Sequence, residues 1–202
     1  MCEMQTFMAL IKKLETREYI KSLLACFGAP TIRGLKPGCL INLRRCGDVC
    51  VAATWRALGP ELIRGFGVDA VTLSSRENDR DSSALILMYE RELLRRALFT
   101  REALRILAPL GYGRCVPCVE SCLGRLAERF KECFPHEVGI FLGYPPEDVD
   151  GFMRDGGKKP LASGYWKVYG DVGQARKTFR MFKRAERLAA RSVIRRSLHA
   201  AA

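Results

Sequence analysis

The residues best suited to chemistry in this chain are the adjacent pair His136 and Glu137. A histidine titrates near neutral pH and can act as a general base or a metal ligand. Adjacent residues diverge on a helix or a strand, so Glu137 cannot simply orient the imidazole of His136. The pattern is not a His-Glu-x-x-His zinc site either, because Ile140 stands where the second histidine belongs. We take both residues as catalytic candidates, although a capping role after Pro135 is the more common one for a lone histidine.

A second candidate site lies where aromatic and basic side chains alternate, at Tyr165, Trp166, Lys167 and Tyr169. Such a pattern can stack the bases of a single-stranded nucleic acid. Strand alternation is the simpler explanation, because it puts Trp166 on one face and Lys167 on the other. Tyr144, which ends the segment after the histidine, is a further binding candidate.

Nine cysteines occur in the chain, and three of them follow one another closely at Cys115, Cys118 and Cys122. A Cys-x-x-Cys pair can ligate zinc or an iron–sulfur cluster, or cycle as a dithiol. On one continuous helix Cys133 would lie about 27 Å from Cys115, too far for a shared metal. We therefore expect these cysteines mainly as small core residues on one helix face and assign no metal. A partial site at the first three stays open if the helix starts after Pro117.

The C-terminal segment 171–202 carries +7 of the chain's net charge of +12. Arginines recur there at steps of three and four residues, which places them on one helical face about 28 Å long. They are Arg176, Arg180, Arg184, Arg187, Arg191 and Arg195. Such a face could bind a nucleic acid or another anionic surface, such as that of a membrane. The solvated outer face of an ordinary amphipathic helix is the plainer explanation.

The elements that must position these residues follow from hydrophobic periodicity and turn signals. Helices are expected at residues 4–27, 52–66, 90–97, 100–110, 115–133, 146–154 and 171 onward, and strands at 39–43, 68–73, 83–89 and 164–169. Strands 68–73 and 83–89 should form a hairpin, and the second should be central because it is apolar on both faces. The fold class is therefore α+β: a small mixed or antiparallel sheet covered by helices, with a long basic C-terminal helix. We expect residues 1–170 to form one domain, to which 171–202 adds a basic helix and a tail that frays from Ser197.

Composition narrows the class of protein further. Apolar residues at 48% and charged residues at 28% are ordinary for a globular domain and exclude wholesale disorder. The longest apolar stretch, residues 84–89, is far too short to span a membrane. We recognise no signal peptide, so the cysteines predict free thiols in a reducing cytosol. We find no phosphate-loop, dinucleotide or Ser-His-Asp pattern, and the cofactor stays unassigned.

Three sequence blocks indicate a family. They are Ala29-Pro-Thr-Ile-Arg-Gly-Leu-Lys-Pro37, Phe134-Pro-His-Glu-Val-Gly-Ile-Phe-Leu-Gly-Tyr-Pro-Pro-Glu-Asp-Val-Asp-Gly-Phe152 and Gly164-Tyr-Trp-Lys-Val-Tyr-Gly-Asp171. Their order and spacing resemble a family of uncharacterised bacterial proteins, common in clostridia, called domain of unknown function 3793 (DUF3793). The resemblance covers about residues 5–185 and implies no activity, and the arginine-rich extension beyond it is expected to be peculiar to this protein. Many members of that family carry a polar residue or a cysteine where this chain has Phe27-Gly28, so we expect no nucleophile there.

The leading hypothesis is a cytoplasmic, non-enzymatic binding or regulatory protein whose basic C-terminal helix meets an anionic partner. The first alternative is a small enzyme with a pocket around His136, Glu137, Tyr165 and Trp166. The second is a metal or redox protein that uses the three clustered cysteines.

Overall fold

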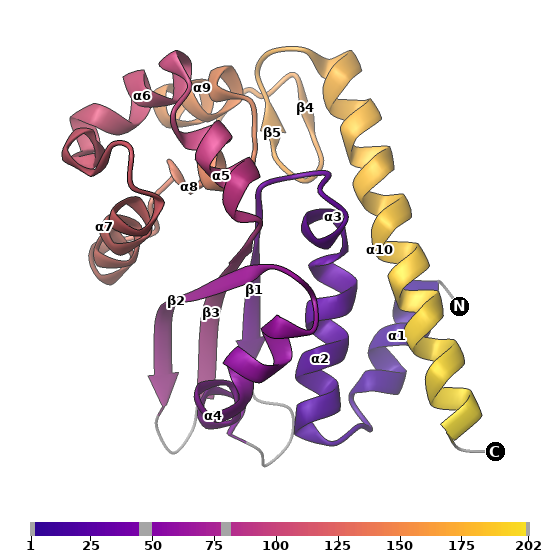
Figure 1. Ribbon diagram of the computed structural model, residues 1–202. Coiled ribbons are helices and arrows are strands. Elements are labelled where there is room, and N and C mark those ends of the chain that lie inside the picture. Colours follow the sequence, from indigo (N-terminus) through magenta and orange to yellow (C-terminus); the bar gives the residue numbers. More distant parts are fainter. Residues whose placement is uncertain (1–2, 45–49, 78–81, 201–202) are drawn as a thin grey trace.

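The computed structural model describes residues 3–44, 50–77 and 82–200 (Figure 1). The strands are β1 (Gly38–Arg44), β2 (Asp69–Glu77), β3 (Ser82–Tyr89), β4 (Ala162–Ser163) and β5 (Lys167–Val168). The helices are α1 (Glu3–Ile11), α2 (Thr16–Phe27), α3 (Ala29–Ile32), α4 (Val51–Arg64), α5 (Arg91–Leu98), α6 (Arg101–Leu107), α7 (Val119–Glu132), α8 (Val138–Phe141), α9 (Pro146–Asp155) and α10 (Val172–Ala200). These elements confirm the α+β fold class.

Strand β3 is the central strand of the larger sheet, whose order is β1-β3-β2 with both pairings antiparallel. Ile86 of β3 pairs with Ile41 of β1. Both faces of β3 are covered, because Ile86 and Met88 belong to one buried cluster while Leu87 and Tyr89 belong to another. The predicted hairpin with an apolar central strand is therefore confirmed.

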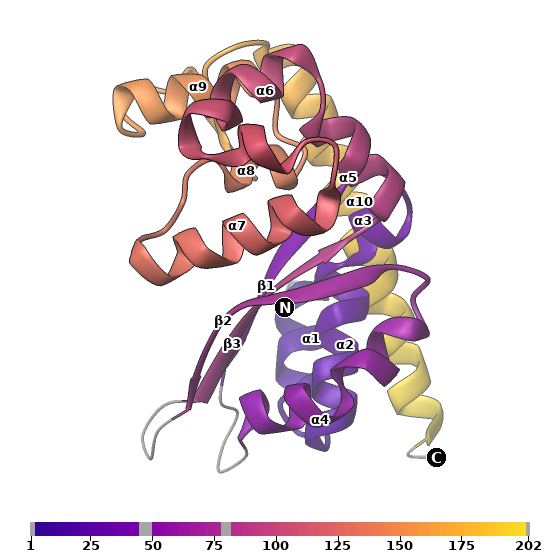
Figure 2. The ribbon, with the colours of Figure 1, turned by 60° about the vertical axis from the view of Figure 1, so that its left-hand side comes forward.

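Different helices cover the two faces of this sheet, as Figure 2 shows. Helices α2 and α4 contact one face, and with α1 and α10 they enclose the first buried cluster. Helix α7 contacts β2 on the other face, and α5, α6, α8 and α9 join it around the second cluster. A third, smaller cluster joins the β4-β5 hairpin to the start of α10 and contains Trp166, Val168, Ala175 and Phe182.

Helix α10 packs along α1, α2 and α3 (Figure 1). Its buried face supplies Ala175 and Phe182 to the third cluster and Ala190 and Val193 to the first. The tail from residue 197, expected to fray, is helical as far as the structure describes it, because Val193 anchors the preceding turn. In the ranges the structure describes, no helix is both long and apolar enough to cross a membrane.

Three of the differences between the observed and the predicted element boundaries have a clear local reason. The helix expected over residues 4–27 is two helices, because the chain makes tight turns at residues 13 and 14 before α2 begins. The helix expected from Cys115 begins only at Val119, and the thiol of Cys118 caps it by accepting a 3.4 Å hydrogen bond from a backbone N–H. The strand expected over 164–169 pairs only at β5, because Gly164 N–H donates to the Trp166 carbonyl at 3.0 Å across a tight turn.

Candidate ligand-binding site

A cavity of about 630 Å³ lies where the three buried clusters meet. Its walls come from α2, α3, β1, α8, α9, the β4-β5 hairpin and α10. His136 and four binding candidates from the sequence line it: Tyr144, Tyr165, Trp166 and Lys167. A cavity of this size accommodates a small organic molecule.

Lys36 reaches this cavity because the chain around it packs tightly against α8 and the turn that follows. Gly143 has a φ of +75°, and a Cβ atom there would lie 2.3 Å from Pro37 Cδ. A Cβ atom on Gly38 would lie 2.7 Å from the carbonyl oxygen of Phe141. Since only glycine permits such close approaches, these two positions hold the segment at Pro37 and Gly38 against the second family block.

The Lys36 side chain is buried, and within the described ranges no carboxylate forms an ion pair with it. The residue is 8% exposed, and its Nζ lies 5.7 Å from the ring centre of Tyr144 and 5.3 Å from that of Phe182. Among the described residues, none accepts a hydrogen bond from its Nζ or forms an ion pair with it. Burial lowers the pKa of Lys36, although Cys39 and Glu186 act in the opposite direction. The amine is therefore left for whatever occupies the cavity.

Glu186 brings a carboxyl group to the same cavity from α10. Its Oε2 accepts a 2.7 Å hydrogen bond from the Tyr165 hydroxyl. Burial raises the pKa of Glu186, against the opposing effects of that hydrogen bond and of the Lys36 and Lys183 charges. Burial also raises the pKa values of Tyr165 and Cys39. The environment thus favours the neutral forms of these cavity groups.

An aromatic wall forms one boundary of the cavity. The rings of Tyr144 and Trp166 stack with centroids 4.8 Å apart and planes inclined by 26°. Phe179 meets the Trp166 ring edge-on, with centroids 4.5 Å apart. The Tyr144 hydroxyl donates to the Tyr165 carbonyl at 3.2 Å, and burial raises its pKa to about 12. Tyr144 and Trp166 thus make this boundary of the cavity aromatic.

Asp148, which is 2% exposed, fixes this wall. Its Oδ2 accepts a 2.6 Å hydrogen bond from Trp166 Nε1. Its Oδ1 accepts hydrogen bonds from the backbone N–H groups of Tyr169 and Gly170 at 2.6 and 2.8 Å. Because protein donors occupy both oxygens, Asp148 acts as a positioning residue for the wall.

His136 and Lys167 lie at the exposed edge of the cavity. The His136 ring packs against Phe152 and Phe134, with centroids 4.9 and 6.3 Å away. Lys167 Nζ donates to the Gly157 carbonyl at 2.6 Å. The imidazole is exposed and has no hydrogen-bond partner in the described part of the chain. Its ring nitrogens are therefore available to a ligand.

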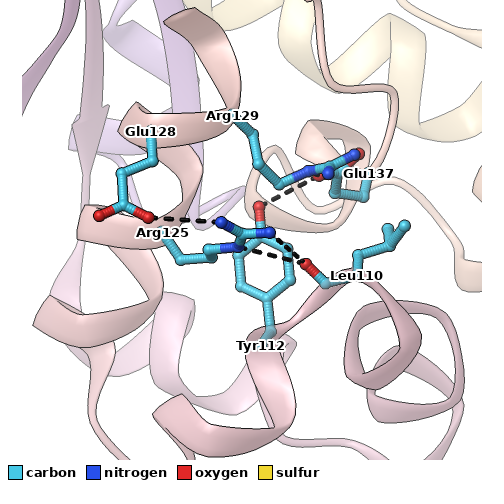
Figure 3. A network of polar contacts seen from close by, with 6 residues as sticks. All are labelled: Leu110, Tyr112, Arg125, Glu128, Arg129 and Glu137. Atoms are coloured by element: carbon cyan, nitrogen blue, oxygen red, sulfur yellow. Dashed lines mark hydrogen bonds and ion pairs between the residues drawn. The ribbon is translucent and has the colours of Figure 1, made fainter. Parts of the chain in front are cut away.

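Glu137 does not line the cavity, which corrects the expected pocket around both His136 and Glu137. Its carboxylate is 1% exposed and turns into the second cluster, as Figure 3 shows. There Arg129 forms an ion pair with it, and the Tyr112 hydroxyl donates to Oε1 at 3.2 Å. Arg125 lies alongside and donates to a backbone carbonyl through contacts of 3.3 and 3.2 Å. The divergence of adjacent side chains thus puts these two candidates in different environments.

Cys115, Cys118 and Cys122 gather near the start of α7, outside the cavity. Cys122 is buried in the second cluster, and burial, helped by the other two thiols, raises its pKa to about 12. Within the described ranges, no group of three or more His, Cys, Asp or Glu side chains is arranged to hold a metal ion. The metal alternative therefore finds no support at these cysteines.

The arginines of the predicted C-terminal stripe are exposed on α10 and do not line the cavity. Arg191 forms an ion pair with Glu3 of α1. Four others have no ion-pair partner among the described residues: Arg176, Arg180, Arg184 and Arg187. The exposed side chains of Met181 and Leu188 lie among them. The basic face is thus separate from the cavity.

Sequence reasoning missed five polar residues that line the cavity: Lys36, Cys39, Asp148, Ser163 and Glu186. A lysine in an expected loop and a cysteine in an expected strand carry no chemical signal of their own. Glu186 did carry a signal, because it stands four residues after Phe182 and therefore lies on the same face of the last helix as that apolar residue. A carboxyl group on a buried stripe needs a polar partner, and Tyr165 supplies it.

The sequence matches the family described as protein of unknown function (DUF3793) over residues 24–200. No curated protein and no solved structure matches the chain. The matched range includes every residue that lines the cavity, from Phe27 to Glu186. It also includes the end of α10, which corrects the expectation that the arginine-rich extension lies outside the family. The chain therefore belongs to the DUF3793 family of proteins of unknown function.

Proposed function

We propose that the protein binds a small organic molecule in the cavity beside Lys36. The ligand has an aromatic or alicyclic body and an oxygen group that accepts hydrogen bonds from the Lys36 amine. One observation carries this proposal: Lys36, a residue that is 8% exposed and has no hydrogen-bond acceptor for its amine among the described residues, lines a largely apolar cavity. Burying an amine in this way costs folding free energy, and a ligand oxygen offsets that cost.

The other cavity residues define the ligand class. The stacked rings of Tyr144 and Trp166 favour a flat apolar body. The Tyr165 and Glu186 pair offers a second polar contact, and His136 a third at the exposed edge. Of the residues in the enzyme hypothesis, His136, Tyr165 and Trp166 line this cavity and Glu137 does not. Lys36 lines the cavity in place of Glu137.

Saturation-transfer NMR with benzoate tests this proposal, because benzoate joins an aromatic ring to oxygen acceptors. The wild-type chain should transfer saturation to the ring protons. Lys36→Met keeps an unbranched apolar stem but lacks the amine, and it should abolish the transfer. Lys131→Met is the matched control, because that lysine is exposed on α7 and lies outside the cavity. The proposal is wrong if Lys36→Met keeps the full signal or if the wild type gives none.

A second candidate function is the binding of nucleic acid by the basic face of α10. The specific observation in its favour is the set of exposed arginines without ion-pair partners in the described chain: Arg176, Arg180, Arg184 and Arg187. A guanidinium that no carboxylate holds can bind a phosphate in bidentate geometry. Their spacing follows one face of a long helix, as tracking along a phosphate backbone requires.

Fluorescence anisotropy with a labelled single-stranded RNA across a salt series tests this second function. Each arginine that contacts a phosphate contributes about 0.7 to the salt slope. Substituting all four by Gln should therefore lower the slope by about 3. The control substitutes four exposed arginines elsewhere and removes the same charge: Arg64, Arg76, Arg101 and Arg105. Equal losses in both variants, or no salt slope in the wild type, would contradict a role for α10.

A further inference from the structure

The reactivity of Lys36 follows from where its amine lies. A neutral amine is a nucleophile, whereas an ammonium ion is not. The Lys36 Nζ lies near the rings of Tyr144 and Phe182, at 5.7 and 5.3 Å from their centres, and no described residue accepts its protons. Burial lowers its pKa, so a larger share of this amine is neutral than of an exposed lysine. A buried amine of this kind suits bond formation as well as hydrogen bonding.

A proton donor stands in the same cavity. Lys36 and Glu186 are close enough to shift each other's pKa, and both line the cavity. Burial raises the pKa of Glu186, which favours the protonated carboxyl group, and the Tyr165 hydroxyl holds its Oε2 at 2.7 Å. The site therefore combines a nucleophilic amine with an acid that can give and take a proton.

We infer that Lys36 forms an imine with the carbonyl carbon of an aldehyde or ketone held in the cavity. This inference rests on the proposed function and names the substrate class of that same site. An aldehyde or ketone has the oxygen acceptor that the proposed function requires, and its carbon is the electrophile that a neutral amine attacks.

The step balances without an oxidant or a reductant. The lone pair of Nζ forms a bond to the carbonyl carbon, the C–O π pair moves to oxygen, and that oxygen takes a proton from Glu186. Nζ returns one proton to the Glu186 carboxylate, which leaves a neutral carbinolamine. Glu186 then protonates the hydroxyl group, which leaves as water while the lone pair of Nζ forms the C=N bond. Loss of the second Nζ proton to Glu186 gives the neutral imine and restores the acid.

Cys39 is another nucleophile in the cavity, and its product with an aldehyde can be distinguished from that of Lys36. Burial raises the pKa of its thiol, which disfavours the reactive thiolate. A thiol adds to an aldehyde to give a hemithioacetal, which hydride reagents do not convert into a stable amine. Reductive trapping therefore reports on Lys36 and not on Cys39.

The experiment uses the full chain, benzaldehyde as the probe and sodium cyanoborohydride, which reduces imines and leaves the aldehyde intact. Peptide mass spectrometry locates the resulting benzyl group among the ten lysines of the chain. At limiting benzaldehyde the label should appear at Lys36 before it appears at exposed lysines such as Lys131. Glu186→Gln should slow Lys36 labelling roughly tenfold or more, because it removes the proton donor.

Two controls separate this inference from the proposed function. Lys36→Met should lose the selective label, and Lys131→Met, at an exposed position of α7 outside the cavity, should keep it at Lys36. Labelling that follows surface exposure, with Lys36 unlabelled, overturns the inference. If benzoate still gives Lys36-dependent saturation transfer in that case, the binding function stands without the covalent step. If both experiments fail, both proposals are wrong.

Discussion

Among the single side chains, Lys36 matters most for the proposed binding site. Its amine is removed from water, and two aromatic rings replace only part of the lost hydration. The titratable groups that influence it are Cys39 of β1 and Glu186 of α10. Burial of the Lys36 amine destabilises the protein when the cavity is empty. Such a cost in stability is expected at a residue that serves function.

Lys36→Met should therefore raise the free energy of unfolding at neutral pH by about 1 kcal/mol or more. Folding holds the pKa of Lys36 below its ordinary value of 10.5, so the unfolded chain binds this proton more tightly. Wild-type stability should rise with pH between the folded and unfolded pKa values, and the advantage of the variant should shrink over that interval. Urea unfolding of both proteins from neutral to alkaline pH measures this difference. An advantage that stays constant with pH would show that the amine is not desolvated.

Asp148 gives a second test at the residue scale. Asp148→Asn replaces one carboxylate oxygen by an NH₂ group that faces protein N–H donors. We expect a loss of about 1–3 kcal/mol in the free energy of unfolding, because a buried donor is left unsatisfied. Asp150→Asn is the control on the same helix, since that side chain is 63% exposed. Equal effects of the two changes would contradict the role assigned to Asp148.

Part of the site could be predicted from residue types, and part could not. His136, Tyr144, Tyr165 and Trp166 stand out by their chemistry or by their density in the sequence, and all line the cavity. Lys36 does not stand out, because its significance comes from burial, which depends on contacts distant in the sequence. Glu137 seemed as suitable as its neighbour, yet its direction depends on the arginine and tyrosine that bind it.

At the scale of elements, the contact between Pro37 and Gly143 joins the segment before β1 to the turn after α8. Gly143→Ala should lower the free energy of unfolding by more than the roughly 1–2 kcal/mol cost of a left-handed residue, because its Cβ would also meet Pro37 Cδ at 2.3 Å. Gly67→Ala is the control: its φ is +66° and nothing lies within 4 Å of its added Cβ. Denaturant unfolding compares the two variants. A smaller loss for Gly143→Ala than for Gly67→Ala would show that this contact is not tight.

Elements with a clear local sequence signal, such as an apolar run, were predicted well. The apolar run of β3 forms the expected strand. Thr100 and Asp171 cap α6 and α10, and each accepts a hydrogen bond from a backbone N–H three residues on. The break between α1 and α2 was missed, since the apolar periodicity continues across it. The start of α7 was predicted too early. The helix begins after Cys118, because the thiol of this residue caps it by accepting a hydrogen bond from a backbone N–H.

At the scale of the whole molecule, α10 links the clusters, since its buried face serves the first and the third. Phe182 is 2% exposed and lies against Lys36. Phe182→Ala should cost about 3–5 kcal/mol of unfolding free energy, whereas Met181→Ala, at a position 47% exposed, should change it by no more than about 0.5 kcal/mol. Thermal or denaturant unfolding of both variants measures this. Similar small losses would show that α10 is not part of the core.

The same packing determines how the basic face should be studied. A chain cut after Ala175 would lose Phe182, Ala190 and Val193 together with the arginines. Loss of nucleic-acid binding in such a chain would follow from unfolding as well as from lost charge. Substituting exposed arginines by Gln leaves the buried face of α10 intact, which makes it the cleaner test.

A crystal structure of the full chain with benzoate would test the proposed binding site most directly. Benzoate should lie in the cavity, with its carboxylate within hydrogen-bonding distance of Lys36 Nζ and its ring against Tyr144 and Trp166. Benzoate bound elsewhere, or a Lys36 side chain that leaves the cavity for solvent, would contradict it.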